Sequence, residues 1–370
     1  RVCAEMRGKL SVAFVPYWGA GNPYQNALAG QLSSLGVQVD MGYSLKGLFR
    51  YGVVLNGRPD IVHMHWLPVF GWRQWRFLRC AVFVLRLVLL RLWGIPLIWT
   101  IHNLVPHESS HPRIDWLLAR IVAGLSSGLI VHGQGARQQA IETWGLRDES
   151  RFAVIPHGNY MDDYPNRVDR AAARQRLALD DAELVFLFLG AVRPYKGVLE
   201  LIEAYRRLAG EHTVLIVAGQ PLDEDFMRTV EGACAGVESI RFHPGFVPDE
   251  AIQVYMNAAD AVVLPYRHLL SSGAALLAMS FGKPCVGPAM GCLADVLDES
   301  GAFLYDPESE TGLLEGMRRA IDVRDTLAQM GEYNRQKASQ WTWQRAAAAT
   351  MALYDRCLSE AGSARGDMVC

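Results

Sequence analysis

Cysteine is scarce in this sequence, and no two cysteines form a CxxC pair. Seven cysteines are scattered over 370 residues, an odd number at wide spacing. We therefore predict reduced thiols, with neither a disulfide framework nor a zinc knuckle. Residues 1–10, RVCAEMRGKL, contain no apolar signal core, so we expect a cytoplasmic protein.

Extremes of composition are also missing. With 51% hydrophobic and 20% charged residues, the sequence is unlike those of disordered or fibrous chains, and its length favours two domains. The formal net charge of −2 conceals an asymmetry, because residues 1–165 are basic overall and residues 166–370 are acidic. We expect the two halves to bind different partners, with no nucleic acid among them.

Apolar runs alternate with helical stretches in the first half of the chain. The runs are LSVAFVPYW (10–18), DIVHMHW (60–66), PLIWTIHN (96–103) and SGLIVHG (127–133). Short, continuously apolar runs separated by helices are typical of the strands of a parallel, doubly wound sheet.

The same pattern begins again near residue 183. The runs here are ELVFLFLG (183–190), HTVLIVAG (212–219), SIRFHPGFV (239–247) and ADAVVLPY (259–266). We predict an α/β fold of two Rossmann-like domains facing a cleft, with parallel sheets that bind ligands beyond the carboxyl ends of their strands. The predicted parts are a domain over 1–165, a polar linker at 157–170, a domain over 166–340 and a helix within 341–370 that crosses back to the first domain.

Acidic residues are absent between Asp60 and Glu108, and this gap contains the basic, apolar segment 73–93. On a helical wheel its five arginines fall within an arc of about 140°, and the opposite face is apolar. A membrane-spanning helix would place several arginines in hydrocarbon, at roughly 2.5–3.5 kcal/mol each near the centre. We therefore predict a helix that lies on an anionic membrane surface. The residues predicted at that surface are Trp75, Arg76, Arg79, Arg86 and Trp93. The alternative is a buried helix whose arginines line a cleft or the protein surface.

The segment GAVRPYKGVLELIEAY (190–205) brings two cations to the start of a helix. A strand ends at Gly190, and Arg193 and Lys196 lie in the loop before the helix. The helix dipole and its free N–H groups favour an anion, and arginine can bind it in a bidentate manner. A second segment, LPYRHLLSSGAALLAMSFGKP (264–284), repeats the arrangement. Its candidate residues are Tyr266, Ser271, Ser272 and Gly273.

Taken singly, each segment fits ordinary helix capping as well. Together in one half of the chain, they favour a nucleotide diphosphate as the ligand.

These motifs resemble those of GT-B glycosyltransferases over nearly the whole chain. RPYKG, VAG (217–219), GFVPDEAIQVYMNAADAVVLPY (245–266) and SFGKPCV are similar to the sugar-nucleotide domain of that superfamily. The resemblance implies that Arg193 and Lys196 hold the donor diphosphate. It also implies that the stretch containing Gly245 and Val247 lies near the nucleotide base.

The sequence departs from the retaining members of that superfamily, which carry a Glu-x7-Glu pair. Leu269 and Leu277 occupy the two positions here. TIHNLVPHE (100–108) and the two cation-bearing motifs resemble bacterial exopolysaccharide β-mannosyltransferases of the xanthan-assembly type. That resemblance implies inverting transfer from GDP-mannose to a polyprenyl-diphosphate-linked oligosaccharide on the inner face of the cytoplasmic membrane. Apart from the nucleotide sugar, it implies no cofactor and no metal.

Inversion by a single displacement requires a base on the acceptor side. Glu108 is our candidate because it ends the loop after the third apolar run, and His102, His107 and His111 in the same region are alternatives. His63 and His65 lie two apart on a strand, but no third ligand stands at the spacing of a metal site. We interpret them as core or site-lining residues.

Further donor contacts are expected from Gly19 and Gly21, in the loop after the first strand, and from His157 at the domain boundary. Three other functions stay open: transfer from a UDP-sugar, sugar-nucleotide epimerisation, and a non-catalytic glycosyltransferase-like subunit. A NAD-dependent dehydrogenase is disfavoured because the first loop reads GAGNPYQ rather than GxGxxG.

Overall fold

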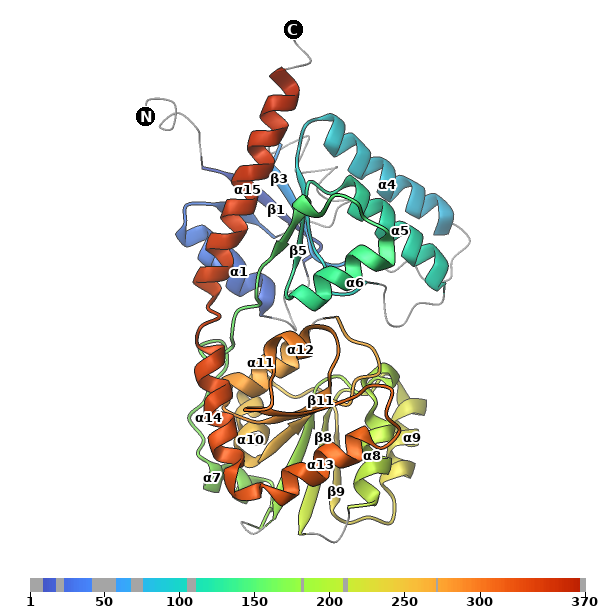
Figure 1. Cartoon of the computed structure of the whole chain (residues 1–370), viewed down its shortest axis with the longest axis vertical. Coiled ribbons are helices and arrows are strands. Elements are labelled where there is room, and N and C mark those ends of the chain that lie inside the picture. The colour runs from blue at the N-terminus through green and yellow to red at the C-terminus, as the bar shows by residue number, and fades with distance from the viewer. Residues whose placement is uncertain are drawn as a thin grey trace. The chain divides into compact units, whose positions relative to one another are not determined.

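A computed structural model of the chain describes residues 9–17, 23–41, 58–67, 76–104, 111–180, 183–208, 212–270 and 272–366. They belong to two compact units, residues 1–158 with 342–370 and residues 159–341 (Figure 1). Each unit is built around its own six-stranded sheet, and every strand pair in both sheets is parallel. The predicted α/β fold with two Rossmann-like domains is confirmed.

The first unit has the strand order β2-β1-β3-β4-β5-β6. Its strands are β1 (Ser11–Val15), β2 (Gln38–Asp40), β3 (Ile61–Met64), β4 (Leu97–Thr100), β5 (Gly128–Val131) and β6 (Phe152–Val154). Its helices are α1 (Tyr24–Ser34), α4 (Arg76–Leu92), α5 (Pro112–Leu125), α6 (Gln134–Trp144), the short 3-10 turn η2 (Glu149–Arg151) and α15 (Trp343–Gly366).

The returning helix α15 completes the core of the first unit. It packs against α1, and the Tyr354 hydroxyl lies 2.6 Å from Nδ1 of His63 on β3. Gly128 of β5 has no room for a side chain, because a Cβ there would lie 2.9 Å from Leu353. The predicted crossing-back of the terminal helix is therefore confirmed.

The second unit has the strand order β12-β11-β10-β7-β8-β9. Its strands are β7 (Leu184–Leu189), β8 (Thr213–Gly219), β9 (Ile240–Pro244), β10 (Ala261–Val263), β11 (Cys285–Pro288) and β12 (Ala302–Tyr305). Its helices are α7 (Arg170–Arg176), η3 (Pro194–Lys196), α8 (Val198–Arg206), α9 (Glu224–Cys234), α10 (Asp249–Ala258), α11 (Gly273–Ser280), α12 (Gly291–Val296), α13 (Gly312–Asp322), η4 (Arg324–Thr326) and α14 (Leu327–Ala338).

The apolar runs form the central strands because both faces of each sheet are covered. Every residue of β7 and β8 is buried, as a strand between two helical layers requires. Three strands were not predicted, namely β2, β11 and β12. β2 contains Gln38 and Asp40, β11 contains Gly287 and Pro288, and β12 is a partly exposed edge strand, so none of the three shows the pattern of a buried central strand.

The polar stretch predicted as a linker, 157–170, belongs mainly to the second unit, which begins at Asn159 instead of residue 166. The Asn159 N–H donates to the carbonyl of Trp341 at 2.7 Å. Further along, the side-chain oxygen of Gln253 accepts from the backbone N–H of Arg167 at 2.7 Å. Side chains and backbone of the second unit thus satisfy polar groups that the sequence alone leaves to solvent.

Candidate active site

The carboxyl edge of the second sheet brings three loops together. Gly197 and Gly219 both have positive φ, +69° and +148°, and neither could carry a side chain. A Cβ on Gly197 would collide with the Pro265 carbonyl, and one on Gly219 would collide with the Gly190 carbonyl. The loops after β7, β8 and β10 are therefore in backbone contact, which fixes the groups that they carry.

Arg193 and Lys196 lie in the first of these loops. The Arg193 guanidinium donates to the Gln220 carbonyl at 3.1 Å, which holds it over the end of β8. The Lys196 ammonium lies 5.8 Å from the centre of the Tyr266 ring. No carboxylate in the described part of the chain forms an ion pair with Lys196. Desolvation and the nearby charge of Arg193 lower the pKa of Lys196 to about 8, so the edge holds a cation that an anion would stabilise.

Helix α11 begins next to Tyr266, whose hydroxyl is hydrogen-bonded to the Ser272 side chain. Ser272 is buried, and its hydroxyl caps the helix by accepting from the Ala275 N–H at 3.1 Å. Gly273 is the first helical residue. The capping alternative is thus observed for the Ser272 side chain, while the first N–H groups of the helix stay available to an anion.

The loop after β9 adds an apolar group to the same edge. The Gly245 N–H donates to the Gly219 carbonyl at 3.1 Å, so this loop is tied to the end of β8. Val247 is half-buried, whereas the ring of Phe246 is 68% exposed. We call this edge, with Arg193, Lys196, Tyr266 and the start of α11, the cationic edge.

The carboxyl edge of the first sheet is different in kind, because four successive strands each lead to histidine. We call this group the histidine row; its members are His63 and His65 from β3, His102 after β4, His132 after β5 and His157 after β6. Tyr24, the first residue of α1, contacts four of the rings, with centroids 4.9–5.6 Å away. His63 and His65 are stacked at 4.4 Å.

Burial keeps the histidine row neutral. Desolvation lowers the pKa of His63 and of His157 to about 3 and that of His132 to about 4. It also lowers the pKa values of His65 and His102, which neighbouring imidazoles depress further. Nδ1 of His132 is bonded to the Ile155 carbonyl at 3.0 Å, but its Nε2 and both ring nitrogens of His65 are buried without a hydrogen-bond partner among the described residues. Such groups can offer donors and acceptors to a neutral ligand.

A third feature lies on α4 and its neighbour α5. Phe83, Leu87 and Leu90 of α4 are buried, and the side of α4 predicted to be apolar faces solvent. Phe77 and Leu92 are 75% and 76% exposed. Six of the twelve exposed large hydrophobic side chains of the described chain are on these two helices: Phe77, Leu78, Leu85, Leu92, Leu117 and Ile121.

Arginines flank these exposed apolar side chains. Arg79 is exposed, Arg86 is half-buried, and Arg91 donates to the Ser127 hydroxyl at 2.6 Å. The only acidic residue of the two helices, Asp115, is buried. None of the described helices is both long and apolar enough to cross a membrane.

Comparison with known proteins agrees with this arrangement. Residues 169–337 match a family model described as glycosyl transferases group 1, and residues 41–159 match one described as glycosyltransferase family 4. A GDP-mannose:glycolipid 4-beta-D-mannosyltransferase of Xanthomonas campestris pv. campestris is 30% identical over 71% of this chain and 72% of its own. The chain belongs to the GT-B glycosyltransferases of group 1.

Other relatives of this glycosyltransferase differ in what their names say. A D-inositol 3-phosphate glycosyltransferase of Geodermatophilus obscurus is 27% identical over 83% of this chain and 69% of its own. Sucrose-phosphate synthase from Thermosynechococcus elongatus has the same fold, with a TM-score of 0.76 at 17% identity over 95% of this chain and all of its own. HepE from Anabaena, solved with UDP and glucose, has a TM-score of 0.71 at 18% identity over 94% of this chain and all of its own.

The structure brings some of the predicted site residues of the glycosyltransferase together. Eight of the predicted donor-binding residues lie at the cationic edge. They are Gly190, Arg193, Lys196, Gly245, Val247, Tyr266, Ser272 and Gly273. His102 and His157 belong to the histidine row instead. Six predicted residues lie outside the described residues: Gly19, Gly21, Trp75, His107, Glu108 and Ser271. Arg76 begins α4, and Trp93, just after that helix, lies under the Arg58 guanidinium at 5.0 Å.

Sequence reasoning missed His132 and Trp343, which contact His157 together with Tyr24. The sequence offers a signal for His132 alone, because it follows a predicted strand as His102 does. No group of three or more His, Cys, Asp or Glu side chains in the described ranges could hold a metal ion.

Proposed function

We propose that this glycosyltransferase moves mannose from GDP-mannose to a polyprenyl-diphosphate-linked oligosaccharide, with inversion at the sugar carbon. The observation that carries the proposal is the cationic edge, where Lys196 lacks a carboxylate partner among the described residues and Arg193 is fixed beside it. The named activity of the Xanthomonas relative supports the choice of sugar and acceptor class.

The cationic edge suits a diphosphate because it offers three kinds of donor within one rigid frame. Arg193 supplies a planar fork, Lys196 a compact charge, and α11 the first N–H groups of a helix. When the donor bond breaks, negative charge grows on the diphosphate. Fixed cations and dipoles then stabilise the leaving group without reorganising.

The residues at the two positions where retaining relatives carry glutamates support inversion. Leu269 and Leu277 cannot form or stabilise a glycosyl intermediate. A single displacement instead requires a base for the acceptor hydroxyl, and we propose Glu108, with His102 or His107 as alternatives. The histidine row and Tyr24 would offer neutral hydrogen-bonding groups to the acceptor sugar.

The exposed apolar side of α4, continued by Leu117 and Ile121 on α5, supports membrane association. Apolar side chains would enter the acyl boundary, and the arginines would meet anionic headgroups. A lipid-linked acceptor is held in that same layer. We therefore propose a peripheral location on the inner face of the bacterial cytoplasmic membrane.

Titration calorimetry with GDP-mannose, GDP, UDP-glucose, UDP-glucuronate and UDP tests the donor. We expect GDP and GDP-mannose to bind at least tenfold more tightly than the uridine compounds. Preference for a uridine nucleotide would replace GDP-mannose and reopen the epimerase. If no nucleotide binds, the non-catalytic subunit becomes the better explanation.

The Glu108→Gln variant tests the base. We expect transfer to fall by at least roughly 10²-fold while donor affinity stays unchanged, because the amide cannot accept the acceptor proton. Glu142→Gln, an exposed position on α6, is the control. Near-normal turnover by Glu108→Gln would move the role to His102 or His107.

A further inference from the structure

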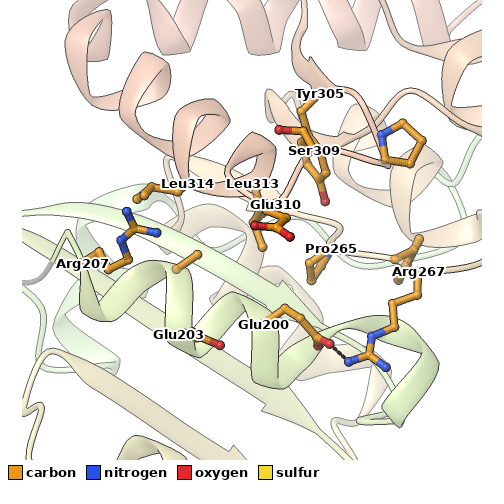
Figure 2. A pocket seen from close by; sticks show the side chains of 13 residues that line it. Glu200, Glu203, Arg207, Pro265, Arg267, Tyr305, Ser309, Glu310, Leu313 and Leu314 are labelled. Carbon is orange, nitrogen blue, oxygen red and sulfur yellow. Dashed lines mark ion pairs between the residues drawn. The ribbon is translucent and has the colours of Figure 1, made fainter.

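A cavity of about 270 Å³ opens on the second unit, and of the residues assigned to the diphosphate only Tyr266 lines it (Figure 2). Its walls come from α8, from the loop after β10, and from the segment that joins β12 to α13. Its volume lies just below the roughly 300–1,000 Å³ typical of sites for drug-sized ligands. The cavity is therefore sized for a ligand of one or two rings.

The cavity combines an apolar floor with a rim of both charges. Tyr305, Pro265 and Pro307 contribute ring surfaces to the lining, and Leu313 and Leu314 add aliphatic side chains. At the rim, Figure 2 shows Glu203 on α8 and Arg207 just after that helix on one side, and Glu310 facing them across the opening.

An ion pair joins Glu200 to Arg267 at the other end of the rim (Figure 2). One acceptor and one donor are thus held side by side. Neighbouring hydroxyls of a single ring could engage both, since each hydroxyl can donate and accept.

The rim argues against three other classes of ligand. Three carboxylates, Glu200, Glu203 and Glu310, oppose a phosphate or a nucleotide. No described carboxylates are grouped as a metal ion requires. A lipid chain would bury the charges of the rim without pairing them, which is costly.

We propose that this cavity is a second saccharide site, which shares only Tyr266 with the cationic edge and takes an uncharged sugar ring. Carboxylates at the rim accept hydrogen bonds from the sugar hydroxyls, the guanidiniums donate to hydroxyl oxygens, and the C–H face of the ring covers the surface formed by Tyr305 and the prolines. Tyr266 lines the cavity and also lies beside Lys196, and the Arg267 N–H donates to the Tyr195 carbonyl at 3.0 Å. The site would therefore hold a glycan next to the donor loop without taking part in the transfer.

Ligand-observed saturation-transfer NMR on the full chain tests the site, with methyl β-D-mannopyranoside and methyl β-D-glucopyranoside as probes. We expect millimolar binding of at least one glycoside. The double variant Glu203→Gln, Glu310→Gln should reduce the signal at least fivefold. Both side chains are exposed, so folding should be retained, as a thermal melt would check. Glu231→Gln, an exposed position on α9 outside the cavity, is the matched control.

A second pair of variants examines the floor. Tyr305→Phe keeps the ring and should keep binding, whereas Tyr305→Leu should lose it. Equal signals from the wild type and the double variant would place the glycoside elsewhere and overturn the proposal, as would the absence of any signal at about 50 mM probe. GDP titrations of the same variants should be unchanged, so a failure of donor binding would count against the proposed function alone.

Discussion

The carboxyl edges of the two sheets bear different chemistry on the same architecture. In the first unit, four buried imidazoles, the half-buried His157 and the buried Tyr24 are neutral. In the second unit, Arg193 and Lys196 are half-buried in a loop whose close backbone contacts require glycine at Gly197 and Gly219. The comparison teaches that burial decides the charge of an edge as much as residue type does. A neutral edge suits a hydroxyl-bearing acceptor, and a cationic edge suits a charged leaving group.

Lowering the pH should destabilise the histidine row of the first unit before it affects the cationic edge of the second. The pKa values of the histidine row are lowered in the folded chain, so the unfolded chain binds protons below about pH 6.5 that the folded chain refuses. Stability is therefore full above that pH and is lost as the pH falls towards about 3. Each histidine contributes up to about 1.4 kcal/mol per pH unit. We expect the melting temperature to fall clearly between pH 7 and pH 5.

Two asparagine variants separate the histidine row from a general acid effect. His132→Asn can keep the bond to the Ile155 carbonyl and should reduce the pH slope. The control is His212→Asn, an exposed position with a φ of +52° that asparagine tolerates. Identical slopes for His132→Asn and the wild type would show that the row does not govern acid stability.

Removing the cation should disable the second edge without changing the first. Lys196→Met deletes a charge-assisted contact worth about 1.5–3 kcal/mol, so donor affinity at pH 7 should fall about 10–150-fold in calorimetry. The acid profile should be unaltered. Lys337→Met, which removes a cation paired with Asp298 in the same unit, serves as the control. Wild-type affinity in Lys196→Met would exclude this lysine from the diphosphate site.

Raising the pH above about 8 should weaken donor binding at the cationic edge, whereas lowering the pH should destabilise the histidine row. The pKa of Lys196 is about 8 without ligand, and a bound diphosphate would raise it because the anion favours the ammonium. Binding then takes up a proton above pH 8, so donor affinity should fall by up to about tenfold per pH unit there. Lys196→Arg, which stays charged, should give a flat profile between pH 7 and pH 9.

The smallest expected effect is on membrane binding by α4, which lies outside both edges. Arg79→Gln should weaken co-sedimentation with anionic vesicles by about fivefold, since one arginine near the surface contributes about 1 kcal/mol. Donor affinity and the acid profile should not move. Arg228→Gln on α9 is the control. If Arg79→Gln sediments like the wild type, α4 is not the membrane contact.

Much of the fold and one of the two edges can be predicted from sequence. Long apolar runs such as 183–190 give strands because both faces of the sheet are buried. Arg193 and Lys196 are found because the strand, the cations and the helix start are local in sequence. The histidine row cannot be found in this way, because its members are spread from residue 63 to residue 157 and meet only through strand order. The prediction that residues 157–170 form a linker was wrong for a related reason. The segment is bonded to Gln253, which is distant in the chain.

The discontinuous first unit has a consequence for synthesis on the ribosome. Its sheet is covered by α15, which reaches His63 and Gly128 but is translated only after residues 159–341. At about 5–20 residues per second, the wait lasts roughly 10–40 s. The second unit can fold in that interval, whereas the first keeps an open apolar face. The second unit should therefore fold before the first unit is complete. The N-terminal part of the nascent chain should be the part that depends on chaperones.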